Sequence, residues 1–117
     1  MTQREINKII RKWKKILRLE DWIITAEKFK STSDSLAKCS ITSERKTCRI
    51  SLFFPHQDLD GTEQNIETSI VHEMVHIYFD PFWPNDPDKQ RAKVLLIEHA
   101  VDALSEALVR CSCPKTT

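Results

Sequence analysis

The chain has 117 residues, of which 40% are hydrophobic and 30% charged, and its formal net charge is +1 at pH 7. This is enough apolar material for one hydrophobic core, and no apolar run approaches the ~20 residues that span a membrane. The lone glycine, Gly61, excludes the glycine-rich phosphate-binding loops of nucleotide-binding folds. We therefore expect a single domain with neither a nucleotide-binding loop nor a transmembrane segment.

The basic residues are concentrated at the start of the chain. Residues 1–19 contain seven basic side chains and one acidic side chain, Glu5. Apolar residues recur there at helical spacing, which predicts a basic amphipathic helix that packs its apolar side on the core. A helix that binds nucleic acid or a membrane surface is the alternative. No apolar segment of signal-peptide length follows, so we expect a cytoplasmic protein with free thiols.

The segment from residue 22 to residue 54 predicts a small twisted sheet. Residues 22–29 are rich in β-branched and aromatic residues, whereas residues 37–42 and 47–54 alternate between apolar and polar. The polar link between the last two runs predicts a hairpin, and its apolar side includes Cys39 and Cys48. We expect both cysteines to act as small hydrophobic residues on the inner side of the sheet.

Two further helices are predicted in the second half of the chain. A capping-box pattern at residues 60–63 predicts a helix over residues 62–79. The Asp-Pro pair at residues 86–87 suits the N-cap and first turn of a helix over residues 87–110, which leaves residues 111–117 as a short tail. Helices that flank a small separate sheet correspond to an α+β fold in one domain.

The predicted helix over residues 62–79 contains the sequence HEMVH, from His72 to His76. Two histidines four residues apart lie one turn apart on the same side of a helix, so both imidazoles can bind one metal ion. Glu73 is offset from that line, too far round to complete the ligand set but able to hold a metal-bound water. This is the His-Glu-x-x-His motif of zinc peptidases.

A catalytic zinc also needs a third protein ligand and an open position for water. Glu98 and Asp102 are four residues apart within the apolar stripe of the last predicted helix, so they share a face that should be buried. The apolar positions of that stripe include Val94, Leu95, Val101, Leu104 and Leu108. Buried carboxylates are costly unless neutralised, which predicts Glu98 as a zinc ligand and Asp102 as the acceptor for a ligand histidine N–H. His99 is the rival third ligand, and Asp102 favours Glu98 because it supports the same face.

His-Glu-x-x-His followed by Glu-x-x-x-Asp on a later helix resembles the gluzincin metallopeptidases, and the small size resembles the minimal single-domain members, the minigluzincins. The resemblance covers about residues 47–110. It implies His72, His76 and Glu98 as zinc ligands, Glu73 as general base and acid, and Asp102 as support for His72. It also implies that the strand over residues 47–54 forms the upper rim of the cleft and pairs with an extended substrate backbone.

The expected reaction is hydrolysis of a peptide bond in a protein or peptide substrate. Zinc lowers the pKa of its bound water towards ~7 and polarises the scissile carbonyl, and Glu73 takes the water proton and delivers it to the leaving amine. A group that stabilises the gem-diolate is normally present as well. The candidates for it are Tyr78, His99, His56 and Arg91.

Other functions remain open besides a zinc endopeptidase. The chain could be a zinc-binding regulatory protein with latent activity, a structural protein without metal, or a nucleic-acid-binding protein that uses its basic first helix. The presence of Glu73 favours the peptidase over the regulatory protein, because a structural zinc site needs no base and closes its fourth position. We expect a monomer.

Overall fold

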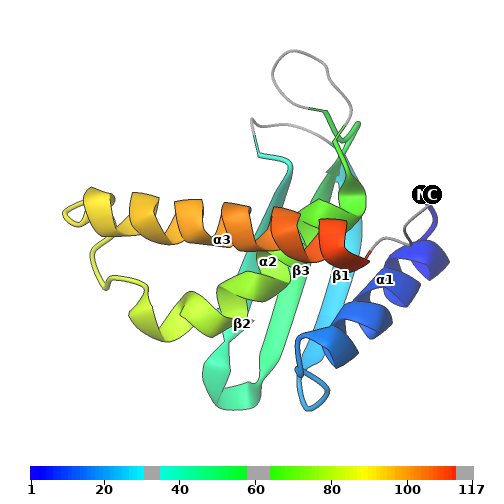
Figure 1. Cartoon of the computed structure of the whole chain (residues 1–117), viewed down its shortest axis with the longest axis horizontal. Coiled ribbons are helices and arrows are strands. Elements are labelled where there is room, and N and C mark those ends of the chain that lie inside the picture. Colours follow the sequence, from blue (N-terminus) through cyan, green and yellow to red (C-terminus); the bar gives the residue numbers. More distant parts are fainter. Residues whose placement is uncertain (31–34, 58–63, 113–117) are drawn as a thin grey trace.

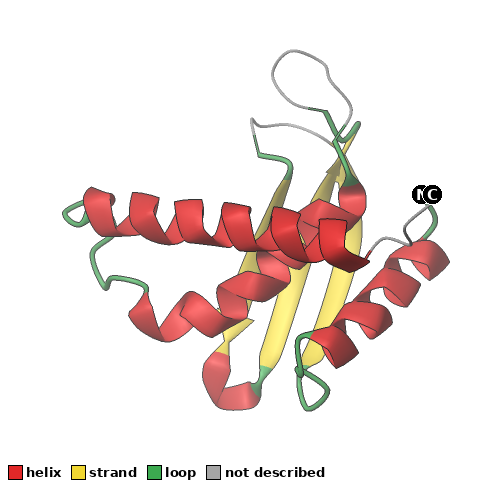
Figure 2. Cartoon of the chain, viewed as in Figure 1, coloured by secondary structure: helices red, strands yellow, loops and turns green. Residues whose placement is uncertain are grey.

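The computed structural model of the chain describes residues 1–30, 35–57 and 64–112. The helices and strands form two layers, with a third helix stacked on the helical layer (Figures 1 and 2), and the predicted α+β fold class is confirmed. In chain order the elements are α1 (Gln3–Ile16), β1 (Ile23–Lys30), β2 (Ala37–Thr42), the 3-10 helix η1 (Ser43–Arg45), β3 (Thr47–Phe54), α2 (Ile66–Phe79), the 3-10 helix η2 (Asp80–Phe82) and α3 (Arg91–Ser112).

The sheet has the strand order β1-β3-β2. The predicted hairpin is confirmed, because β2 pairs antiparallel with β3 and Cys39 lies opposite Ile50. β1 pairs with the other side of β3 in parallel, with Ile24 opposite Cys48. β3 is therefore the central strand, and β2 is an edge. The expectation that residues 47–54 form the rim of a cleft and pair with substrate is wrong, because both backbone edges of that strand are already hydrogen-bonded to neighbours.

One face of the sheet carries the core. Alternate residues of β3 are buried on it, namely Cys48, Ile50 and Leu52. α1 and α2 pack on this face, and α3 lies across α2 on the side away from the sheet (Figure 1). The opposite face consists largely of polar or exposed side chains, so the fold has a single core between its sheet and its helices.

α1 packs its apolar side on the core, as predicted. Ile6, Ile10 and Trp13 are buried, and all the basic side chains of the helix except the half-buried Lys14 are exposed. The helix ends at Ile16 rather than at residue 19. Arg18 takes a left-handed conformation with φ 59°, its N–H bonds to the carbonyl of Lys15, and the next N–H bonds to the carbonyl of Lys14. This is a Schellman motif, which stops a helix and here lacks the usual glycine.

The two later helices both begin after their predicted starts. α2 begins at Ile66, with the side chain of Asn65 accepting a hydrogen bond from the Thr68 N–H, rather than at residue 62. The proposed capping box at residues 60–63 lies outside the described residues. α3 begins at Arg91 rather than at residue 87, because Asp86 instead caps a separate turn. It is the longest helix of the described chain, yet no described helix combines the length and apolarity needed to cross a membrane.

Three cysteines lie within the described residues and all are free, as expected: Cys39, Cys48 and Cys111. Cys113 lies outside the described residues. Cys48 is completely buried in the core, which raises the pKa of its thiol to about 12, with smaller contributions from the negative charges of Glu73 and Asp80. It behaves as the small hydrophobic residue that the alternation of the strand predicts.

Candidate metal centre

The predicted metal-binding motif lies in the middle of α2. The sheet-facing side of that helix is apolar and buried, with Ile70, Met74 and Ile77 in the core, which fixes the rotation of the helix about its axis. His72 and His76 emerge one turn apart on the other side, with side chains 20% and 11% exposed. The centroids of their rings lie 5.0 Å apart, in an edge-to-face arrangement. Ordinary packing of the helix therefore places two imidazoles side by side.

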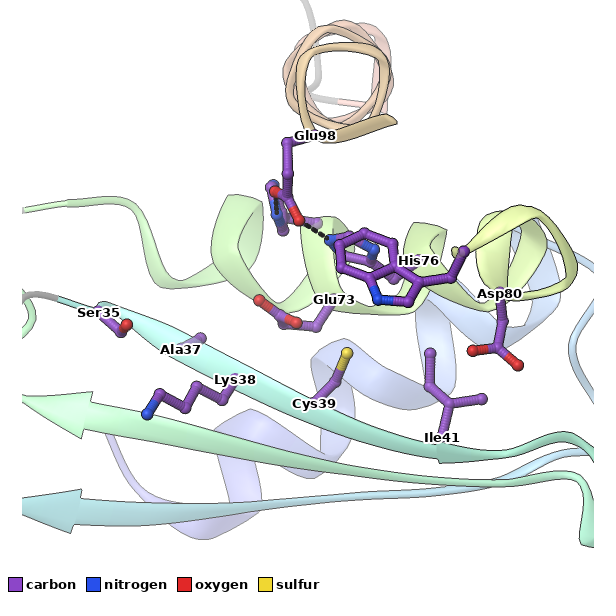
Figure 3. Close-up of a pocket in the computed structure, with 11 residues that line it drawn as sticks. Ser35, Ala37, Lys38, Cys39, Ile41, Glu73, His76, Asp80 and Glu98 are labelled. Carbon is purple, nitrogen blue, oxygen red and sulfur yellow. Dashed lines mark ion pairs between the residues drawn. The ribbon is translucent and has the colours of Figure 1, made fainter. Parts of the chain in front are cut away.

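Glu98 of α3 reaches down between these two histidines. Its Oε1 lies 3.1 Å from His76 Nε2, and its Oε2 lies 3.4 Å from His72 Nε2 (Figure 3). One ligand atom from each of the three residues lies within 4.8 Å of the others, so the group could hold a metal ion. His99 is exposed and does not belong to this group. The structure thus brings Glu98, rather than His99, to the two histidines.

Asp102 lies one turn further along α3 and contacts the far side of the His72 ring. His72 Nδ1 lies 2.8 Å from Asp102 Oδ1. In that arrangement the Nδ1–H donates to the carboxylate, and the lone pair of Nε2 points towards Glu98 and the candidate metal position. The predicted contact between Asp102 and His72 is present.

The predicted burial of these two carboxylates is wrong. The Glu98 side chain is 38% exposed and that of Asp102 is 64% exposed. Leu95 and Leu104 of the predicted stripe are also exposed, by 64% and 45%. The residues of α3 that are actually buried are Ile97, Val101, Ser105 and Val109. Their spacing of four residues follows the ridge that α3 presses onto α2, and the carboxylates flank this ridge where α2 meets solvent.

Glu73, the predicted general base, lies on the side of α2 that faces β2 (Figure 3). It is only 7% exposed and projects from α2 into the space between the helix and β2 (Figure 3). The thiol of Cys39 on β2 faces it. Burial raises the pKa of the Cys39 thiol well above its usual range, and the charge of Glu73 and a hydrogen bond to it raise that pKa further. The thiol therefore stays protonated beside the Glu73 carboxylate.

Sequence reasoning missed this contact between Cys39 and Glu73. The alternation of β2 correctly assigned Cys39 to the inner side of the sheet, where it is half-buried. Which residue of α2 it would meet depends on how the helix is set along the strand, and no local pattern specifies that distance. The contact is visible only after the hairpin register and the helix position are both known.

The donor group, which consists of His72, His76 and Glu98, lies between two cavities that both reach β2 at Ala37. One, of about 510 Å³, extends from the donor group towards Asp80 and Trp83. The other, of about 490 Å³, extends the opposite way towards Asp102 and Glu106. His72 and Glu73 line both cavities, as do Ser35 and Ala37. A ligand that follows β2 can therefore pass the donor group and occupy both sides of it.

None of the four candidates for a gem-diolate stabiliser lines either cavity. The hydroxyl of Tyr78 donates to the carbonyl of Leu17, which ties α2 to the end of α1. His56 is 4% exposed, with Nδ1 3.1 Å from the carbonyl oxygen of Phe53 and Nε2 2.8 Å from the Ser69 hydroxyl. The other two, His99 and Arg91, are exposed on α3. Tyr78 and His56 are thus hydrogen-bonded to other parts of the fold, away from both cavities.

The chain was compared with protein-family models, with curated proteins and with solved structures, and no match was found in any of the three.

Proposed function

We propose that this protein is a zinc-dependent peptidase of the gluzincin type, with His72, His76 and Glu98 as the zinc ligands and Glu73 as the general base. The observation that carries the proposal is the position of Glu98, whose two carboxylate oxygens lie 3.1 Å and 3.4 Å from the Nε2 atoms of the two histidines. The sequence motif gives only two ligands, and the third arrives from a separate helix 22 residues further along the chain.

The donor set fits zinc. Two imidazole nitrogens and one carboxylate oxygen are ligands typical of catalytic zinc sites, which use three protein ligands and keep one position open. Asp102 adds the hydrogen bond that orients such a histidine ligand. Zinc bound there would supply a Lewis acid that polarises a carbonyl group and lowers the pKa of water. Structural zinc sites use four protein ligands, and the described residues offer three in this group.

Each nearby side chain then has a separate task. Glu73 accepts the proton of the attacking water and returns it to the leaving amine, which breaks the peptide bond. The Cys39 thiol faces the same carboxylate as a neutral, protonated neighbour, because burial and the charge of Glu73 raise its pKa. Asp102 holds the ring of His72 so that Nε2 faces the metal.

The free edge of β2 suits an extended peptide. β2 bonds to β3 on one side, lies at the edge of the sheet on the other, and contributes Ala37 and Cys39 to the cleft. An extended chain can add to such an edge by main-chain hydrogen bonds. Cavities on both sides of Glu73 leave room for chain before and after the scissile bond, which favours an endopeptidase.

The proposal is tested by metal content and by one substitution. Protein purified without chelator should contain one zinc per chain by elemental analysis, and it should cleave a mixed peptide library. Glu73→Gln should retain zinc and the fold but abolish cleavage, because the substitution removes only the proton acceptor.

Three outcomes contradict the proposal in different ways. Protein that takes up no zinc even after reconstitution would refute the metal site and the peptidase together. Protein that binds zinc but cleaves nothing would instead favour the latent, regulatory alternative. Equal cleavage by wild type and Glu73→Gln would show that Glu73 is not the base.

A further inference from the structure

The cavity of about 510 Å³ ends at a carboxylate that the proposed chemistry does not use. Asp80 lies at the end of α2, seven residues after Glu73, so the two carboxylates project from the same side of the helix towards β2 (Figure 3). The Ser43 hydroxyl donates to Asp80 Oδ2 at 2.7 Å. This bond fixes the carboxylate to the β2–β3 connection and leaves Oδ1 without a partner among the described residues.

The walls between the donor group and Asp80 are apolar. Ile41 and Cys39 project into the cavity from β2 (Figure 3), and Trp83 also lines it. The Trp83 indole packs edge-on against the His76 ring, with centroids 5.8 Å apart, so the wall is attached to a candidate metal ligand. A cavity with apolar walls and a charged end matches a side chain with a hydrocarbon stem and a charged tip.

The sign of the charge at this end is negative. Lys38 is the one basic residue that lines the cavity among the described residues, and it is exposed, with its ammonium group drawn at the opposite end from Asp80 (Figure 3). When a divalent cation is bound, its two positive charges are balanced by the carboxylates of Glu98 and Glu73. Asp80 then remains as an uncompensated negative charge, and no described cation pairs with it.

We propose that the Asp80 cavity is a binding subsite for a basic side chain, a lysine or arginine of the bound peptide, next to the bond that lies at the metal centre. The hydrocarbon stem lies along Ile41 and Trp83, and the cationic tip meets the free oxygen of Asp80. The subsite rests on the proposed function for its role in cleavage, but peptide binding tests it separately.

The experiment measures peptide binding to a form that cannot turn over. Zinc-loaded Glu73→Gln protein is titrated with fluorescein-labelled peptides that differ only in one residue, lysine or its uncharged analogue norleucine, and binding is followed by anisotropy. We expect about tenfold tighter binding of the lysine peptide, as for a charge-assisted hydrogen bond in a partly exposed site. This preference should shrink as the salt concentration rises.

Substitution of Asp80 in the same background locates the preference. Asp80→Asn should remove the tenfold difference while keeping the fold, since an asparagine carbonyl oxygen can still accept from Ser43. Asp80→Lys should reverse it in favour of a glutamate peptide. The matched control is Glu106→Gln, which removes a carboxylate from the other cavity and should leave the preference unchanged. Circular dichroism and zinc content establish that each variant is folded and loaded.

The outcomes separate this subsite from the proposed activity. Equal binding of the two peptides, no binding of either, or a preference lost in Glu106→Gln but kept in Asp80→Asn would each overturn the subsite. If wild type cleaves peptides but shows no preference for lysine, the subsite fails and the peptidase stands. If the preference depends on Asp80 but nothing is cleaved, the subsite stands and the peptidase fails.

Discussion

α1 and α3 are both amphipathic helices, yet their polar residues have different significance. In α1 the apolar stripe is fully used in the core and the basic face is turned to solvent. In α3 the buried ridge is narrow, several leucines are exposed, and Glu98 leaves the edge of the ridge to meet two histidines. A polar residue on the side of a helix opposite the core is simply hydrated. A polar residue at the border of a packed ridge is held in place by its neighbours and stays accessible to a ligand.

That border position lets α3 place Glu98 beside the two histidines without the large free-energy cost of burying a charged carboxylate. A carboxylate 38% exposed keeps part of its hydration, so its negative charge is tolerated even without a bound metal ion. We therefore expect substitutions in α1 to change stability and substitutions at the border of α3 to change metal affinity. The predictions below test that separation.

The largest effect is expected in the core contact of α1. Trp13 is 0% exposed, and its indole N–H donates to Glu67 at 2.7 Å. Trp13→Ala should lower the free energy of unfolding by about 3–5 kcal/mol, because it leaves a cavity and removes one of the two donors to Glu67 Oε2, the other being the Lys12 ammonium group. Urea unfolding measures this loss. The zinc affinity of the molecules that remain folded should be unchanged, and a parallel loss of affinity would mean that the two regions are coupled.

Glu98→Ala should have the next largest effect, on metal binding. It removes the proposed third ligand, so zinc affinity should fall by more than about 100-fold. Losing a residue that only supports a ligand costs up to about that much. The free energy of unfolding without metal should change little, because the side chain is 38% exposed. His99→Ala is the control on the neighbouring position and should bind zinc normally. Competition with a chelating dye measures both, and the reverse ranking would exclude Glu98 as the ligand.

Asp102→Ala should have an intermediate effect. The substitution removes the acceptor 2.8 Å from His72 Nδ1 and frees the ring to turn, which should lower zinc affinity about 10–100-fold. The same dye competition gives the value. Asp102→Asn keeps an acceptor and should recover part of the loss, whereas an affinity equal to that of Asp102→Ala would mean that the negative charge matters more than the orientation of the ring.

The smallest effect is expected on the basic face of α1. Lys8 and Lys15 are exposed and form no ion pair within the described chain. Lys8→Gln with Lys15→Gln should change the free energy of unfolding by no more than about 0.5 kcal/mol and leave zinc affinity unchanged. The same variant also tests the hypothesis that α1 binds nucleic acid. Any DNA affinity of the wild type must fall with salt, and the double variant must reduce that salt dependence.

The parts of the structure that follow from local spacing were predictable. His72 and His76 share a helix face by periodicity alone, and Glu98 with Asp102 does so again. The pairing of β2 with β3 follows from their alternation and the short link between them. The packing of the α3 ridge on α2 brings Glu98 to the two histidines. The only sign of this packing in the sequence was the pair of carboxylates placed among apolar residues.

Failures of prediction occur where tertiary contacts or unusual backbone geometry decide. α1 stops early because Arg18 accepts a left-handed conformation that is normally taken by glycine. The central position of β3 requires β1 to pair in parallel across 24 residues of sequence, and no local pattern encodes such a pairing. Glu98 was predicted to be buried but is partly exposed, because the width of the buried ridge of α3 depends on how α2 packs against it.

The open edge of β2 also bears on how copies of the protein behave towards one another. A strand edge that can receive a peptide can equally receive the same edge of a second molecule, which is how sheet proteins begin to aggregate. Lys38 stands within this short strand as an exposed positive charge, a feature that opposes such pairing. We therefore expect sedimentation velocity to give one monomeric species as the protein concentration is raised, and Lys38→Val to promote self-association.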